Sequence, residues 1–417
     1  MSEKRNIVLI TLDSVRADHC SFMGYYRETT PILNEMARRG LYFENAITAS
    51  VPTGPSMFSI FTASYPLINA TDYNGKLWRR ELSSKITLMD VLTKMGYETI
   101  GFSTNPFTSP YFGFNKGFRK YIDLSEKGRA KDIGTNSYMK RLYLNIKKVI
   151  KKSDTLMNWE DIYDQIISVV EKAKEPFFMW IILLDTHTPY IPPKKYRRFC
   201  KANSLRLLYI YWKLDKNCWR FNDIIPEVYD AYDDSIYYAD KFIKRLWDDI
   251  NSKYDPIFII HADHGDGLGE HGFYHHPPLL YEELIHVPLV IYNADVKGRI
   301  EKPISLLGLA PTILELIGEE NEFPSESFLH GGRDWVISKV FEGGKRKVAI
   351  RTKEWKFITG QKEEDELYYL KKDPYERENV INEYLELAKE MKRIVEIHVK
   401  QEMEKGKIRT ILKKLRG

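Results

Sequence analysis

The sequence predicts an α/β fold with a mostly parallel sheet, and three observations lead to this prediction. Several short runs, beginning with NIVLITL at residues 6–12, are almost continuously apolar and rich in β-branched residues, as in strands buried on both faces. Segments with helical periodicity alternate with these runs. Polar residues cluster directly after the runs, where the carboxyl ends of parallel strands carry functional groups.

The expected strands of the central sheet share this apolar, β-branched or aromatic composition. They are residues 6–12, 98–104, 176–184, 256–261 and 287–292, with a short strand at 41–46. The helices expected between them are residues 30–39, 56–63, 86–95, 159–174 and 231–251.

The first of these helices has clear end signals. Thr30 is the expected N-cap, Pro31 occupies the first helical position, and Gly40 ends the helix.

The pattern changes after residue 330, so we predict a catalytic domain at 1–330 and a small α+β subdomain at 331–417. The subdomain is expected to hold short antiparallel strands and a long basic helix: 347–351, 355–359, 366–370 and 382–414. Two basic segments, 125–152 and 196–221, are interpreted as insertions. The second also interleaves aromatic residues, which is typical of a substrate lid, an interface or a membrane-surface contact.

Composition excludes several classes of protein. The 417 residues are 43% hydrophobic and 13% aromatic, enough to fill a core and too apolar for a disordered chain. A net charge of +5 suits an anionic substrate but is too small to predict nucleic-acid binding. The three cysteines are scattered, which argues against a disulfide framework or a thiolate metal site.

We expect neither a transmembrane segment nor a signal peptide. No apolar stretch approaches the roughly 20 residues needed for a transmembrane segment, and the opening MSEKRNIVLITLDS lacks the apolar region of a signal peptide. The sequence therefore predicts a cytoplasmic location.

Four polar clusters follow predicted strands, at ends that a parallel sheet brings to one edge. They are Asp13, Asn105, Asp185 with His187, and Asp263 with His264. Carboxylate oxygen and imidazole nitrogen together suit a borderline divalent cation. Thr53 lies where a helix begins, so the helix N-terminus favours negative charge on its hydroxyl, and a metal contact would make it a nucleophile.

Longer motifs extend this pattern over nearly the whole chain. They are ITLDSVRADH at 10–19, TTPILNEMARRG at 29–40, TGPSMFSIFTASYP at 53–66, DTHTPY at 185–190, ADHGDGLGEHG at 262–272, LAPTILELIG at 309–318 and LYYLKKDPYERENV at 367–380. Together they resemble the sulfatase family of the alkaline phosphatase superfamily. The resemblance implies an alkaline-phosphatase-like sheet flanked by helices and a metal-dependent hydrolase of phosphate or sulfate esters.

The resemblance assigns a role to each matching position. Asp13, Asp263 and His264 would hold a divalent metal ion (Zn, Mn, Ca or Mg), and Thr53 would contact it as the nucleophile.

Three further residues would contact the substrate. His187 would lie near the leaving-group oxygen, His276 on the substrate oxyanion, and Asn105 near another oxyanion contact, an arrangement in which converging donors stabilise a tetrahedral anion. The expected substrate is a small anionic ester, such as a glycan or lipid-linked phosphate or sulfate ester.

The chain departs from the family pattern in three places. Thr53 replaces the Cys or Ser that true sulfatases oxidise to formylglycine, and Met57 replaces the signature Arg. Ser14 replaces a second Asp ligand, which leaves open whether one metal is held or two. The residues considered for a second metal site are Asp185, His187, His271 and His275.

Because Thr53 cannot form the aldehyde, the favoured hypothesis is a phosphoester hydrolase acting on diesters or monoesters. The alternatives are a sulfuric ester hydrolase with an atypical nucleophile, a phospho-group transferase, and a non-catalytic binding protein on the same fold.

Overall fold

The computed structural model describes residues 4–68, 72–125, 158–214, 225–360 and 364–416. The predicted insertion 125–152 lies outside the described residues from position 126 onward. The insertion 196–221 is described as far as Leu214 and contains α8 (Ser204–Leu214).

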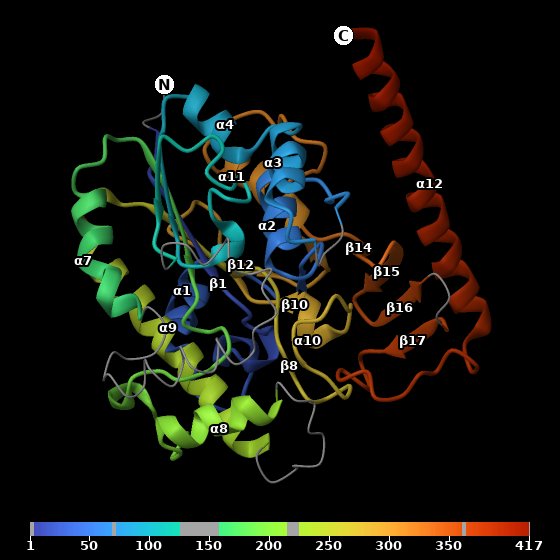
Figure 1. The fold of residues 1–417 in the computed structure, drawn as a ribbon, viewed down its shortest axis with the longest axis horizontal. Helices are drawn as coiled ribbons and strands as arrows, with labels where there is room; N and C mark the ends of the chain where they lie inside the picture. The colour runs from blue at the N-terminus through green and yellow to red at the C-terminus, as the bar shows by residue number, and fades with distance from the viewer. Residues whose placement is uncertain (1–3, 69–71, 126–157, 215–224, 361–363, 417) are drawn as a thin grey trace.

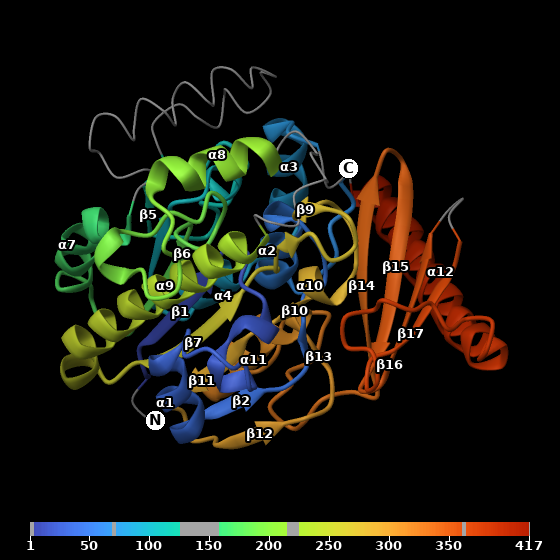
Figure 2. The same ribbon diagram turned by 90° about the horizontal axis from the view of Figure 1, so that it is seen from below.

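An eight-stranded sheet forms the centre of the described chain, and it is mostly parallel as predicted (Figures 1 and 2). The strands in spatial order are β12 (Gly298–Ile300), β2 (Leu41–Phe43), β11 (Leu289–Tyr292), β7 (Ile257–Ala262), β1 (Ile7–Leu12), β6 (Phe177–Leu183), β4 (Glu98–Ser103) and β5 (Lys120–Asp123). The central strand β1 pairs in parallel with both β6 and β7, whereas β11 runs antiparallel to β7. Every residue of β1, β6 and β7 is buried, which explains why their sequences are continuously apolar.

The helices around the sheet form two groups, and Figure 1 shows them on opposite sides of it. One group contains α1 (Pro31–Arg39), α7 (Trp159–Val170) and α9 (Ile225–Tyr254), with α8 packed on α9. The other contains α2 (Thr53–Thr62), α3 (Gly75–Ser83), α4 (Leu88–Lys94) and α11 (Leu309–Leu316). The one-turn helix α10 (Glu282–Ile285) lies beside the C-terminal sheet (Figure 2). Short 3-10 turns occur at Ala17–His19, Ser21–Met23, Pro106–Thr108, Lys194–Tyr196 and Leu306–Gly308.

Two predicted strands are each divided in the structure. Residues 41–46 give β2 and, after a turn, β3 (Ala46–Ile47), which belongs to a separate sheet with β10 (His286–Val287) and β13 (Ile304–Ser305). Residues 287–292 divide at Pro288 into β10 and β11, because proline has no N–H for the strand ladder. Helix α3 was not predicted, and α9 begins at Ile225, before its predicted start at residue 231.

The C-terminal residues form a separate antiparallel sheet and a long helix. The sheet contains β14 (Trp335–Glu342), β15 (Lys345–Thr352), β16 (Trp355–Gly360) and β17 (Glu366–Tyr369) in sequence order. The helix α12 (Leu385–Arg416) packs Ala388, Met391 and Val395 against it (Figure 1). Strand β14 was not predicted.

Among the described residues, we find no helix with the length and apolar character that a membrane crossing requires.

The start of α1 differs from its prediction. The Thr30 side chain makes no cap bond and contacts Ser21 instead. The free N–H groups of Ile32 and Leu33 donate to the carboxylate of Asp240 on α9, at 3.1 and 3.2 Å. A buried carboxylate from a distant helix therefore replaces the local cap.

We predict that Asp240 makes folding stability depend on pH. Burial raises the pKa of Asp240 to about 7, above the ordinary value of 3.8, although the two N–H donors act in the opposite direction. Because the folded state holds this proton more tightly, its stabilisation is present below pH 3.8 and is lost as the pH rises to about 7. Urea unfolding should show that the stability of the wild type relative to Asp240→Asn falls by on the order of 1.4 kcal/mol per pH unit in this window.

The matched control is Asp248→Asn, which removes an exposed carboxylate from the same helix. Its pH profile should follow the wild type, and identical profiles for the wild type and Asp240→Asn would contradict the prediction.

Candidate active site

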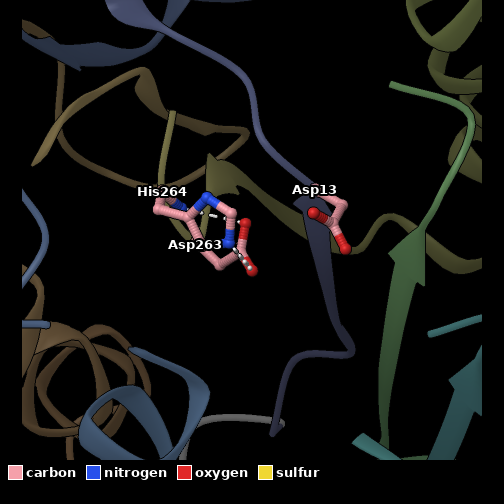
Figure 3. Close-up of side chains that lie close together, drawn as sticks. All are labelled: Asp13, Asp263 and His264. Atoms are coloured by element: carbon pink, nitrogen blue, oxygen red, sulfur yellow. Dashed lines mark hydrogen bonds and ion pairs between the residues drawn. The ribbon is translucent and has the colours of Figure 1, made fainter. Parts of the chain in front are cut away.

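Asp13, Asp263 and His264 lie together at the carboxyl edge of the sheet (Figure 3). Asp13 directly follows β1, and Asp263 follows β7. The two strands pair in register, so that Leu12 lies opposite Ala262 and the two aspartates leave the sheet at the same level. One ligand atom from each of the three side chains lies within 4.8 Å of the others, and all three side chains are completely buried.

Ser14 holds the two carboxylates in place. Its backbone has φ of 64°, a left-handed conformation that is uncommon for a residue with a side chain. The Ser14 N–H donates to Asp263 Oδ1 at 3.2 Å, and its hydroxyl donates to Asp13 Oδ1 at 2.8 Å. The residue that replaces the second family aspartate therefore orients the two that remain.

The charge of this cluster fits a cation. Burial raises the pKa of Asp263, and the neighbouring Asp13 carboxylate raises it further. Burial disfavours the charged form of His264, but Asp263 and Asp13 outweigh it and raise the pKa of that imidazole. The Oδ2 atom of Asp263 is buried, accepts no hydrogen bond and lies 3.4 Å from Nε2 of His264. A buried carboxylate oxygen that accepts no hydrogen bond is costly, so this donor set suits a divalent ion.

Thr53 is the first residue of α2 and lies against this cluster. Its hydroxyl is 3.1 Å from His264 Nε2 and 3.5 Å from Asn105 Nδ2, and the residue is 2% exposed. Asn105 also donates to Asp13 Oδ2 at 2.5 Å. The structure thus brings together residues from four separate parts of the sequence at one point.

His276 and His187 form the other side of the site. The His276 ring lies 4.5 Å from that of His264 and 5.0 Å from that of His187. Burial and the nearby His264 lower the pKa of His276 to about 4. Its Nδ1 lies 3.0 Å from the carboxylate of Asp266, which also accepts a hydrogen bond from Tyr190. Asp266 and Tyr190 therefore orient the His276 ring, a role that the sequence analysis did not assign.

A cavity of about 330 Å³ opens onto Thr53, His187 and His276. Most of its walls are aromatic or proline side chains. The described residues that line it are Pro52, Thr53, Gly54, Pro55, Asp72, Tyr73, Trp78, Phe107, Phe112, His187, Tyr274, His275, His276, Pro277 and Pro278. The aromatic walls of the cavity were not predicted. They come from α3, β9 (Tyr274–His275) and the loop after β4, and these three segments share no sequence motif.

The residues considered for a second metal site do not assemble. His271 bonds to Glu283 and to the backbone oxygen of Glu376, and Asp185 accepts the N–H of Trp159 at the start of α7. Within the described ranges, Asp13, Asp263 and His264 form the one group of three or more potential ligands.

The family of the chain follows from comparison with known proteins. The model of the sulfatase family matches residues 5–319, about three quarters of the sequence. The chain therefore belongs to the sulfatase family, as the motifs predicted, and is a sulfatase-family hydrolase of sulfate or phosphate esters.

Individual relatives are distant. An arylsulfatase of Clostridium perfringens is 26% identical, and the alignment covers 94% of each chain. A structure solved with its substrate D-glucosamine-2-N,6-O-disulfate superposes with a TM-score of 0.72 at 19% identity, over 96% of this chain and 98% of that one. A phosphonate monoester hydrolase of Agrobacterium radiobacter has a TM-score of 0.73 at 18% identity, over 95% of this chain and 96% of that one. These two structures confirm the predicted fold.

We predict that any residue larger than glycine at Gly265, next to His264, lowers the stability of the folded protein. A β-carbon at this position would fall on the carbonyl oxygen of Glu283, and the Gly265 N–H donates to Leu284 O at 2.9 Å. Because both neighbours are backbone, Gly265→Ala should lower the free energy of unfolding by about 1–3 kcal/mol or more. Gly96→Ala is the control: its position is open, and strain at its φ of 93° should cost about 1 kcal/mol. Equal losses in denaturant unfolding would contradict the proposed close contact.

Proposed function

We propose that this chain is a metal-dependent phosphoester hydrolase in which Thr53 is the nucleophile. One observation carries the proposal: the Thr53 hydroxyl lies at the N-terminus of α2, 3.1 Å from His264, beside two buried carboxylates. The helix terminus favours negative charge on this oxygen.

Asp13, Asp263 and His264 would hold the cation. A divalent ion bound there would polarise the ester and lower the pKa of the Thr53 hydroxyl. The mixed oxygen and nitrogen donors favour Zn²⁺ or Mn²⁺, because Ca²⁺ and Mg²⁺ prefer oxygen alone.

In the first step, Thr53 Oγ1, which would lose its proton to solvent when the cation binds, forms a bond to phosphorus while the bond to the leaving oxygen breaks. His187 supplies the proton that the leaving alkoxide needs. Its Nδ1 lies 2.7 Å from the carbonyl oxygen of Thr188, which can only accept, so Nδ1 is the donor there and Nε2 is the nitrogen that transfers the proton.

In the second step, water attacks the phosphothreonine. Neutral His187 takes a proton from this water, the bond from phosphorus to Thr53 Oγ1 breaks, and the nucleophile and His187 return to their starting states. Asn105 would donate to the charged oxygens, since donors aimed at developing charge lower the barrier. His276 would donate there only when both of its ring nitrogens carry a proton, because its Nδ1 already donates to Asp266.

The charge around the cavity favours a monoanionic ester. None of the described residues lining the cavity is a lysine or arginine, and Asp72 adds a negative charge. A divalent cation would be neutralised by Asp13 and Asp263, which leaves little positive charge for a dianionic phosphate monoester. We therefore propose a phosphate diester or a related monoanion as the substrate, and the structural likeness to a phosphonate monoester hydrolase supports this choice.

A sulfuric ester hydrolase is the second candidate. A sulfate monoester is also a monoanion, and the arylsulfatase relative favours it. Against it stands Thr53, which cannot become the formylglycine of true sulfatases.

The substrate class can be tested with three esters that share one leaving group. After reconstitution with Zn²⁺ or Mn²⁺, kcat/KM should be highest for bis(p-nitrophenyl) phosphate, above p-nitrophenyl phosphate and p-nitrophenyl sulfate. Thr53→Ala should lower kcat by at least about 1,000-fold, because the covalent step is lost.

Thr62→Ala is the matched control, since Thr62 is a buried threonine at the other end of α2 whose hydroxyl donates to the backbone oxygen of Phe58 in the same helix. Its kcat should stay within about twofold of the wild type. Sulfate as the preferred substrate would establish the second candidate, and turnover by Thr53→Ala would refute the nucleophile assignment.

Metal binding gives a prediction that does not depend on turnover. The wild type, stripped with a chelator and reloaded, should hold about one Zn²⁺ or Mn²⁺ per chain and gain thermal stability from it. Asp263→Asn should weaken binding at least about 100-fold, because it removes one of two charged ligands. Asp185→Asn, at a half-buried aspartate outside the group, should bind as the wild type does. Equal affinities in all three proteins would rule out the site.

A further inference from the structure

Strand β14 is an edge strand of the C-terminal sheet. Its outer edge is hydrogen-bonded to the loop at residues 48–50. An edge strand presents unpaired backbone groups. Here the Lys339 N–H donates to Ala49 O at 2.9 Å, and the Ser50 hydroxyl donates to Lys339 O at 2.6 Å. The Ser338 hydroxyl donates to Thr48 O at 2.6 Å. The strand therefore holds the loop at 48–50, which leads directly into Thr53.

Thr48 connects this contact to the active site. Its N–H donates to Ile285 O of α10 at 2.9 Å, and its hydroxyl lies 2.9 Å from that of Ser56. The Ser56 hydroxyl donates to the backbone oxygen of Asp263 at 2.7 Å. Because Ser56 uses its single proton on Asp263, Thr48 is the donor in its contact with Ser56. The 2.9 Å distance to Ser56 is shorter than the 3.3 Å from the Thr48 hydroxyl to its other acceptor, the backbone oxygen of Ser50.

Ser338 is thus connected to Asp263 through residue Thr48: Ser338 bonds the Thr48 backbone oxygen, the Thr48 hydroxyl bonds Ser56, and Ser56 bonds the backbone oxygen of Asp263. None of the three hydroxyl residues is more than 1% exposed. Ser56 lies in the first turn of α2, three residues after Thr53. Its bond to Asp263 thus ties the nucleophile helix to the loop that carries the metal ligands.

We propose that Ser338 of β14 is a positioning residue for hydrolysis, acting through Thr48 and Ser56 to fix Thr53 relative to Asp263 and His264. The inference rests on the proposed role of Thr53. Ser338 touches neither substrate nor metal ligand, so its effect is on geometry. A misplacement of about 1 Å at a reacting group can cost about 100-fold in rate.

A purely structural serine would behave differently. Losing its hydrogen bond would lower Tm without changing the turnover of the molecules that remain folded. A positioning residue changes kcat at temperatures well below Tm and leaves KM nearly unchanged, because the walls of the substrate cavity are not altered.

Ser338→Ala tests the proposal against Ser235→Ala. Ser235 is equally buried, in α9, and its hydroxyl also donates to one backbone carbonyl. Both variants should lose a similar amount of Tm. With bis(p-nitrophenyl) phosphate, kcat should fall about 10- to 100-fold in Ser338→Ala and stay within about twofold in Ser235→Ala.

Conservative variants of Thr48 test the same chain from its middle. Thr48→Ser keeps the donor to Ser56 and should retain most of the wild-type kcat, whereas Thr48→Val removes it and should lose turnover as Ser338→Ala does. The rise in Tm on adding Mn²⁺ gives a second readout: Ser56→Ala should require more Mn²⁺ for the same rise, because Asp263 loses its anchor.

The outcomes separate this inference from the proposed function. If Thr53→Ala is inactive but Ser338→Ala keeps the kcat of Ser235→Ala, the positioning role is overturned and the nucleophile stands. If Thr53→Ala is active, Thr53 is not the nucleophile, and the positioning role that rests on it is overturned as well. Should Ser338→Ala not fold, equal kcat values for Thr48→Ser and Thr48→Val overturn the inference on their own.

Discussion

The burial of two carboxylates and an imidazole between β1 and β7 is the constraint on which the rest of the site depends. Negative charge that is removed from water is stable only when it is paired or coordinated. The sheet forces the pairing of Asp13 with Asp263, because parallel strands in register deliver both to one level. The divalent ion that we propose would neutralise this buried charge, and the elements around the cluster would then hold it ready for that ion.

The neighbouring residues restrict the cluster to one geometry. Ser14 bonds both carboxylates, Asn105 bonds Asp13, and the Thr186 hydroxyl donates to the backbone oxygen of Asp13. Each partner comes from the end of a sheet strand, so the order of the strands sets the order of the contacts. Thr53 is the exception: it enters from a helix whose preceding loop is held by β14. The C-terminal sheet is therefore part of the mechanical support of the site.

The features that could be predicted from the sequence are those set by residues close together in the chain. Continuous apolar runs gave the buried strands, and residues following them gave the cluster at the sheet edge. Contacts between distant segments left no such signal. Asp240 caps α1 from about two hundred residues away, and Trp78 and Phe112 line the same cavity because of tertiary packing alone. Apolar and polar residues do not alternate clearly in strand β14, so it was not predicted. Both of its faces are buried, with Ile337 in one core cluster and Val336 in another.

Two of the departures from the family pattern, Ser14 and Met57, each remove a charge, and the two charges have opposite signs. Ser14 removes one negative charge that a second aspartate would bring, and Met57 removes one positive charge that the signature arginine would bring. Met57 is fully buried one helical turn after Thr53, where an unpaired guanidinium would be costly once the second carboxylate is gone. The paired losses keep the net charge of the site unchanged while its polar surroundings become more apolar. Under the proposed role of Thr53 as the nucleophile no aldehyde is needed, so the threonine, the serine and the methionine form one consistent set.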